Sequence, residues 1–251
     1  VIASLLDATK SHGLALAIDR EGRLKLSLAE AKGIRRIDMA APLAVRTWVT
    51  VWASYDATTG QGTLGVLPAA RGAKLQSVQF KSDILNALGV GTLLLGAVAD
   101  GRDPFRFNGR IERPAIFNRA LTADEVQRAG GGGRIDGLVA LWDFSREMHT
   151  SRIIDTGPNG LHGTLVNFPA RAVTGATWTG REPCFRHAPD QYGAIHFHDD
   201  DLEDCRWPAT HAYEVPADLK SGAYALILKA GPAAENIPFF VVPPKNKPSA
   251  K

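Results

Sequence analysis

Hydrophobic and polar residues alternate in several short stretches of the chain, which predicts β-strands rather than long helices. Residues 13–19 and 23–28 alternate at their centres and are joined by Asp-Arg-Glu-Gly. Such a pattern predicts a β-hairpin in which Gly22 supplies a positive φ.

The stretch RTWVTVWASY at residues 46–55 has the strongest strand pattern in the chain. Trp48 and Trp52 fall on one predicted face, while the valines between them fall on the other. Packing in a core is the preferred role for this Trp pair, and a stacking platform for a sugar is the alternative. Further strands are predicted at residues 1–6, 63–67 and 91–98.

The stretch FNGRIERPAIFNRALTADEVQRA at residues 107–129 predicts a strand followed by a short helix. Apolar residues occur on both faces of the strand at 107–118, as expected for a strand that is covered on both sides. Pro114 donates no ladder hydrogen bond, so we expect an edge position or a bulge there. Thr122 and Glu125 form a capping box, and the glycine run 130–133 ends the helix.

Strand, Asn-Arg-Ala-Leu and capped helix together are similar to the closing signature of laminin-G-like, concanavalin-type β-sandwiches. The hairpin at 48–67 also resembles the central hairpin of those domains. In contrast, LVALWDFS at 138–145 followed by DTGPNGLHG at 155–163 resembles their opening. Either a second sandwich starts at Leu138 or the first is circularly permuted, and the short remaining sequence favours permutation.

The last part of the chain differs in character after Tyr192. Its phrase VPADLKSGAYALIL resembles the late strands of an immunoglobulin-like domain, and its predicted strands make about half of such a sandwich. Those strands are expected at 193–198, 211–215, 222–229 and 237–242.

The predicted fold is therefore all-β, with three parts. Residues 1–180 form a laminin-G-like (concanavalin A-like) β-sandwich, permuted or inserted, that lacks its first strands. Residues 181–244 form part of an immunoglobulin-like β-sandwich, and 245–251 form a linker tail rich in Pro and Lys. Residues 1–6 and the strands after Tyr192 are expected to pair with polypeptide outside this chain.

Four phrases, ALWDFS, GLHGTLVNFPARAVTGATWTG, PDQYGAIHFHDDDLEDCRW and IPFFVVPP, resemble the large subunit of the N,N-dimethylformamidase family. These bacterial enzymes hydrolyse dimethylformamide to formate and dimethylamine. The resemblance implies an immunoglobulin-like domain interrupted by a laminin-G-like insertion, with the catalytic domain after it. Iron in the family is held by tyrosines and a glutamate of that catalytic domain, so no catalytic or cofactor-binding residue is assigned in this chain.

His196, His198 and Asp200 are the metal-ligand candidates of this chain. The two histidines point the same way on a strand and Asp200 could join them, but the pattern offers no third fixed ligand. The alternative is a strand end whose polar side chains cap the following turn. His196 also departs from the resemblance, which leads us to expect an apolar or aromatic residue there.

Other chemistries lack their motifs. No G-x-S-x-G or H-E-x-x-H sequence occurs, and the glycine run at 130–133 lacks the Lys-Ser/Thr of a phosphate-binding loop. Glu112 has no partner carboxylate on its own strand for glycosidase chemistry. The two cysteines, Cys184 and Cys205, form one disulfide or, as we favour, stay free thiols.

The composition of the chain limits the classes of partner that it is expected to bind. The chain has 251 residues, 45% of them hydrophobic, and a net charge of +3 without a basic cluster interleaved with aromatics, so nucleic acid is not expected. No apolar run suits a membrane span. We expect a cytoplasmic protein, with secretion left open because the chain starts at Val1.

Two functions remain. One is a non-catalytic β-sandwich portion of a dimethylformamidase-like amide hydrolase, which serves subunit packing and active-site access. Its partners would be the rest of the same gene product (upstream strands and the catalytic domain) and a small subunit, in an oligomer. The other is a stand-alone laminin-G-like module that binds carbohydrate or protein.

Overall fold

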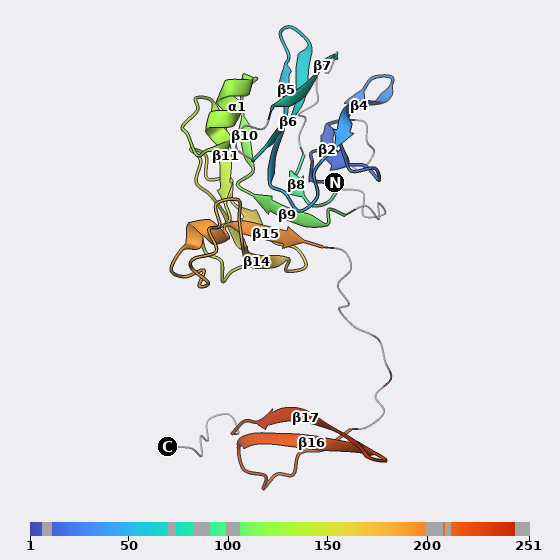
Figure 1. Cartoon of the computed structure of the whole chain (residues 1–251), viewed down its shortest axis with the longest axis vertical. Helices are drawn as coiled ribbons and strands as arrows, with labels where there is room; N and C mark the ends of the chain where they lie inside the picture. The colour runs from blue at the N-terminus through green and yellow to red at the C-terminus, as the bar shows by residue number, and fades with distance from the viewer. Residues whose placement is uncertain are drawn as a thin grey trace. The chain divides into compact units, whose positions relative to one another are not determined.

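The computed structural model describes residues 1–6, 12–69, 74–82, 91–98, 106–198, 208 and 212–243. The chain divides into two compact units, Val1–Asp201 and Leu202–Lys251, each of which is described by itself (Figure 1). The expected boundary between two domains near Gly180 stays a prediction. Within the described ranges most regular structure is antiparallel β-strand, which confirms the β-rich prediction at that level.

The first sheet of unit 1 contains the predicted N-terminal hairpin. Its strand order is β4-β3-β2-β1-β8. Gly22 turns the chain with a φ of 82°, and the Asp19 carboxylate accepts the backbone N–H of Arg23 at 2.8 Å. The strands are β1 (Ala3–Ser4), β2 (Leu14–Ile18), β3 (Arg23–Glu30), β4 (Gly33–Pro42) and β8 (Leu94–Leu95).

Strand β1 lies between two strands of its own chain. Ala3 pairs with Leu16 of β2 on one side and with Leu95 of β8 on the other. The expectation that this strand pairs with outside polypeptide is therefore wrong. The predicted strand at 91–98 forms only at Leu94 and Leu95 among its residues.

A second sheet, β5-β6-β7, packs against the first through a shared core. Leu64 and Val66 of β6 are buried among side chains of β3 and β4, and Val51 of β5 packs beside them. The alternate residues of β5 point away from this core, and Trp52 lies over Gly65, where an added Cβ would be 2.1 Å from the indole. The strands are β5 (Val49–Asp56), β6 (Gln61–Pro68) and β7 (Gln76–Lys81).

The predicted strand at 107–118 is broken into two strands that belong to different sheets. Arg113 has a φ of 47°, and the next carbonyl, that of Pro114, accepts the Trp142 N–H at 3.0 Å. The chain thus leaves one sheet and enters another at the proline. Both strands lie at an edge of their sheet, which confirms the edge position expected from Pro114. The two strands are β9 (Gly109–Glu112) and β10 (Ala115–Phe117).

These two sheets enclose the second core of unit 1. Ile111 and Ile195 come from one sheet, and Ala140, Trp142 and Ile153 from the other. The first sheet has the order β14-β15-β9, with β14 (Ala170–Val173) and β15 (Ala194–Phe197). The second has the order β10-β11-β12-β13, with β11 (Leu138–Asp143), β12 (Arg152–Asp155) and β13 (Gly163–Thr164).

Helix α1 (Ala123–Gly130) begins at the predicted capping box. Thr122 Oγ1 accepts the Glu125 N–H at 3.3 Å, and Glu125 accepts the Thr122 N–H at 2.9 Å. Arg119 also donates to Glu125 at 2.6 Å, and this bond together with the Thr122 contacts lowers the pKa of Glu125 to about 2. A 3₁₀ helix, η1 (Pro189–Tyr192), precedes β15.

Unit 2 contains one described hairpin, β16 (Gly222–Ala230) and β17 (Ala233–Val241). The strands expected at 222–229 and 237–242 are confirmed in this hairpin. The strand expected at 193–198 forms as β15, but it pairs inside unit 1 with β9 and β14. Residues 212–215 are not a strand, and His211 lies outside the described residues.

Candidate functional site

Of the predicted metal ligands, His196 lies on β15, the middle strand of the β14-β15-β9 sheet, and His198 follows directly after that strand. His196 pairs with Ala170 on one side and with Arg110 on the other, and its ring lies 5.0 Å from that of His198. Asp200 lies outside the described residues. The cationic Arg110 beside His196 opposes a bound cation. Within the described ranges, no group of three or more His, Cys, Asp or Glu side chains could hold a metal ion. Because Asp200 lies outside the described residues, metal binding by His196, His198 and Asp200 stays a prediction.

Glu112 lies on the same face of this sheet, because it pairs with Ala194 two residues before His196. Its Oε2 accepts the Ala176 N–H at 2.6 Å. Burial raises the pKa of Glu112, and the nearby Asp143 carboxylate adds to the rise, whereas the Ala176 N–H and Arg113 oppose it. Gly175 lies against this carboxylate, so an added Cβ there would require the Glu112 side chain to shift.

Asp143, whose charge adds to the rise in the pKa of Glu112, is held by its own donors. It comes from the end of β11, and it accepts Ser145 Oγ at 2.5 Å and the Ser145 N–H at 3.0 Å. Burial alone would raise its pKa, but the two Ser145 hydrogen bonds and Arg146 lower it. The pKa of Glu112 is thus raised and that of Asp143 is lowered. Both are engaged by neighbouring backbone or side-chain donors, which is a structural role.

The motif D-x-G-x-x-G-x-H-G closes a loop against β11. The buried Asp155 carboxylate accepts backbone N–H groups of Leu141, Gly157 and Leu161 at 2.7–2.8 Å. Burial opposes ionisation of Asp155, but these donors outweigh it and lower its pKa. The Asp155 N–H donates to His162 Nδ1 at 3.1 Å. This motif therefore holds the loop and strand together.

Arg171 of β14 organises a second loop, which sequence reasoning missed. Its Nη2 donates to the carbonyls of Phe144 and Arg146 at 2.9 and 2.8 Å. Its Nη1 donates to three further carbonyls, those of Glu147, Thr150 and Arg152. Burial lowers the pKa of this guanidinium, and its Nε is buried without a hydrogen-bond partner.

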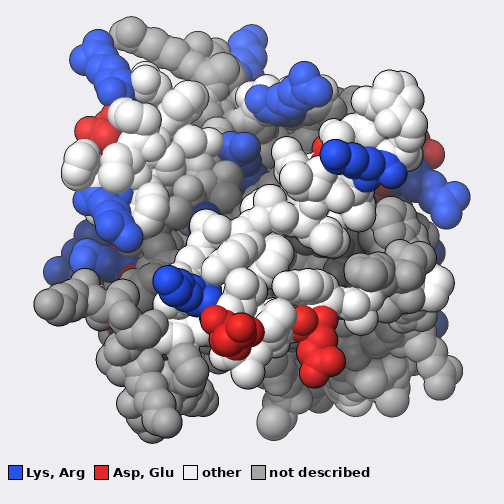
Figure 2. Space-filling model, turned by 90° about the horizontal axis from the view of Figure 1, so that it is seen from below, with Lys and Arg blue, Asp and Glu red and all other residues white. Residues whose placement is uncertain are grey.

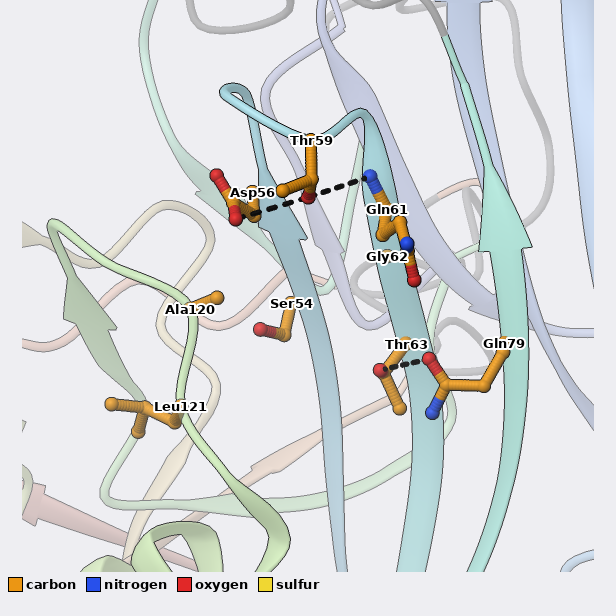
Figure 3. Close-up of a pocket in the computed structure, with 9 residues that line it drawn as sticks. All are labelled: Ser54, Asp56, Thr59, Gln61, Gly62, Thr63, Gln79, Ala120 and Leu121. Carbon is orange, nitrogen blue, oxygen red and sulfur yellow. Dashed lines mark hydrogen bonds between the residues drawn. The ribbon is translucent and has the colours of Figure 1, made fainter.

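An open pocket of about 300 Å³ lies on the outer face of the β5-β6-β7 sheet (Figure 3). Ser54, Thr63 and Gln79 form a row across the three strands, and Thr63 Oγ1 donates to Gln79 Oε1 at 2.8 Å. Ala120 and Leu121 form an apolar wall. The remaining lining residues are Asp56, Thr59, Gln61 and Gly62. This pocket offers neutral hydrogen-bonding groups and one carboxylate.

Charged side chains are dispersed on the face seen in Figure 2, where Lys and Arg are spread around the face and fewer Asp and Glu lie among them. Cys184 is half-buried and makes no disulfide with any described residue, while Cys205 lies outside the described residues. In the part of the chain that the structure describes, no helix is both long and apolar enough to cross a membrane.

Comparison with known proteins identifies relatives over the whole chain. A family model described as N,N-dimethylformamidase β subunit-like, C-terminal, matches residues 170–251, which include β14 to β17. The N,N-dimethylformamidase β subunit of Paracoccus aminophilus is 34% identical over 276 aligned positions, which cover 100% of this chain and 36% of the relative. The β subunit of an Alcaligenes species is 30% identical and covers 99% of this chain and 36% of the relative.

The chain spans about a third of the length of both relatives. The predicted resemblance is thereby confirmed, and it extends beyond the residues that first indicated it. The chain is homologous, over its whole length, to part of the β subunit of N,N-dimethylformamidase.

Proposed function

We propose that this chain is a non-catalytic, β-rich portion of a dimethylformamidase-like amide hydrolase. Its role is to pack against other parts of the enzyme and to shape access to an active site outside this chain. The observation that carries the proposal is homology along the whole chain to only 36% of each β subunit. Most of a homologous enzyme therefore has no counterpart within this chain.

The arrangement of the polar groups supports a structural role. Asp155 and Arg171 direct their charged groups at backbone atoms of neighbouring loops. Glu112 and Asp143 are likewise occupied by local donors. These groups hold loops in place. The iron that the resemblance implies is assigned to a catalytic domain outside this chain and not to His196 and His198.

The finer assignments belong to the same proposal. We assign unit 1 mainly to a laminin-G-like sandwich and the C-terminal hairpin to an immunoglobulin-like domain. We also propose a cytoplasmic oligomer that contains the rest of the β subunit-like polypeptide, a small subunit, and iron in a catalytic domain outside this chain. The supporting observations are the motifs at 107–129 and 138–163 and the homology to a β subunit.

Hydrolysis of dimethylformamide tests the proposal. The purified chain and the longer polypeptide that carries it are supplied with iron and any co-encoded small subunit, and released dimethylamine is measured. We expect release only from preparations that contain the longer polypeptide. Release by the 251-residue chain alone would place the active site within it, and no release from either would contradict the enzyme class.

A binding module is the second candidate function, and the pocket in Figure 3 is the observation that favours it. The hydroxyl and amide groups of Ser54, Thr63 and Gln79 resemble the hydrogen-bonding partners that a sugar ring needs, and Leu121 supplies an apolar wall. Titration with neutral monosaccharides, followed by NMR shifts, tests it. A sugar-binding module requires shifts that Thr63→Val and Gln79→Ala abolish, and this function fails if no sugar perturbs the β5-β6-β7 sheet.

A further inference from the structure

The hairpin β16–β17 has two apolar faces, and they differ in how much the hairpin itself covers them. Residues that pair across the strands share a face, and the faces alternate along each strand. On one face the Phe239 ring packs against the rings of Tyr224 and Tyr213. The distances between ring centroids are 5.7 Å to Tyr224 and 5.8 Å to Tyr213. These rings cover part of that face with residues of unit 2.

The opposite face, which we call the open face, lacks such cover among the described residues of unit 2. Phe240 and Val242 are each 76% exposed, and Ile227 is 56% exposed. Lys229 is the charged residue on this face and lies near the hairpin turn. The open face consists of Ala223, Ala225, Ile227, Lys229, Ala234, the polar Asn236, Pro238 and Phe240, and the same alternation adds Val242 beyond the last pair.

An apolar face of this kind requires a partner. A two-stranded hairpin is only marginally stable in water by itself, and strands need a third strand or another layer to bury their apolar side. Exposed aromatic and aliphatic groups on adjacent positions mark interaction surfaces. Because small alanines flank Phe240 and Ile227, the open face presents two projecting groups on a flat surface, which suits an apolar protein layer.

We propose that the open face docks against the part of the β subunit-like polypeptide that lies outside this chain. The inference rests on the proposed function, since it names a surface by which this portion packs against the enzyme. Most of each relative's length lies outside the homologous third. The family model that matches residues 170–251 includes the hairpin, so the hairpin is part of a segment that recurs in such β subunits.

A connected partner suits this surface better than a second copy of the chain. A partner within the same polypeptide acts at an effective concentration in the millimolar range, so the face is covered whenever the protein is folded. A second copy would leave Phe240 and Val242 in water at low protein concentration, where exposed apolar groups promote aggregation. The partner surface is expected to be apolar and to carry few charges.

The test compares Phe240→Ser and Ile227→Ser with Phe168→Ser in two proteins, the 251-residue chain and the longer polypeptide that carries it. Phe168 is 83% exposed in unit 1 and therefore controls for loss of an exposed phenylalanine. In the longer polypeptide we expect the open-face variants to raise amide exchange across β16–β17 by roughly tenfold or more, with no such change for Phe168→Ser. In the isolated chain the open-face variants should leave hairpin exchange unchanged.

The other outcomes overturn the inference. Equal exchange in wild-type and open-face variants of the longer polypeptide would mean that the face remains in water. Concentration-dependent self-association of the isolated chain that Phe240→Ser abolishes would assign the face to a second copy. Dimethylamine release is measured on the same samples, because an active longer polypeptide with an unprotected open face contradicts only this inference. A protected face in an inactive polypeptide contradicts only the proposed function.

Discussion

Arg171 donates to the carbonyl of Phe144 at 2.9 Å and thereby links strand β14 to the loop that follows β11. Its two terminal nitrogens reach carbonyls on both sides of that loop, from Phe144 to Arg152. Replacement by lysine keeps the charge but leaves a single donor nitrogen, which cannot span both groups. We expect Arg171→Lys to lower the free energy of unfolding by about 2 kcal/mol, measured by urea denaturation.

The control for this variant is Arg152→Lys. Arg152 is exposed and forms a 3.8 Å ion pair with Glu147, and such surface pairs contribute little to stability. Equal urea midpoints for Arg171→Lys and the wild type would show that the hydrogen bonds from Arg171 to the loop carbonyls do not stabilise the fold.

The lowered pKa of Asp155 predicts that the fold loses stability in acid. Its pKa is lowered in the folded state, so its contribution is present above the pKa of the unfolded chain and is lost as the pH falls through the folded pKa. Asp155→Asn should cost about 2 kcal/mol at pH 7, because one side-chain oxygen is replaced by an amide that faces N–H donors. The difference from the wild type should shrink below the ordinary pKa of aspartate. A constant difference down to the lowest pH at which both proteins fold would be evidence against an ionised Asp155.

The raised pKa of Glu112 predicts the opposite pH dependence of stability. Its pKa is raised in the folded state, so its contribution is fully present below the unfolded pKa and is lost as the pH rises through the folded pKa. Glu112→Gln keeps an oxygen acceptor for the Ala176 N–H and removes the ionisation. We expect the variant to gain stability relative to the wild type as the pH rises through this window, as followed by thermal unfolding. A relative gain on acidification would mean that the sign is wrong.

Replacing Thr122 measures how much the helix cap contributes to the free energy of unfolding. Thr122→Ala removes the acceptor for the Glu125 N–H, and loss of such a cap costs about 1 kcal/mol. Thr122→Ser keeps the hydroxyl and should behave as the wild type in urea denaturation. If alanine and serine give the same midpoint, the cap has no net effect on stability.

Sequence reasoning succeeded where a short segment determines its own structure. The hairpin at Gly22 and the capping box at Thr122 depend on residues within a few positions of each other, and both were predicted. It missed β4 and β7, which are edge strands in their sheets and carry many exposed polar residues, so they lack a clear apolar alternation. The turn at Arg113 was missed as well, because it depends on pairing of Pro114 with Trp142 far along the chain.

The candidate site was less predictable for the same reason. Asp143 lies near Glu112 because the Trp142 N–H donates to the carbonyl of Pro114, two residues after Glu112, and neither strand indicates this pairing by itself. Arg171 binds backbone carbonyls, which leave no pattern in the sequence. The His196 and His198 pair was visible from spacing, while its neighbour Arg110 became visible only through the pairing of β15 with β9.

The switch between sheets at Arg113 and Pro114 has a consequence for how the chain is made. Strand β9 leaves the ribosome early, but its partner β15 follows only at residues 194–197, after the whole of β10 to β14. During synthesis Ile111 therefore lacks its neighbour Ile195, and the second core can form only after β15 has been made. Pairings so distant in sequence are slow to form, so the apolar side chains of this core stay open to misfolding until β15 has emerged.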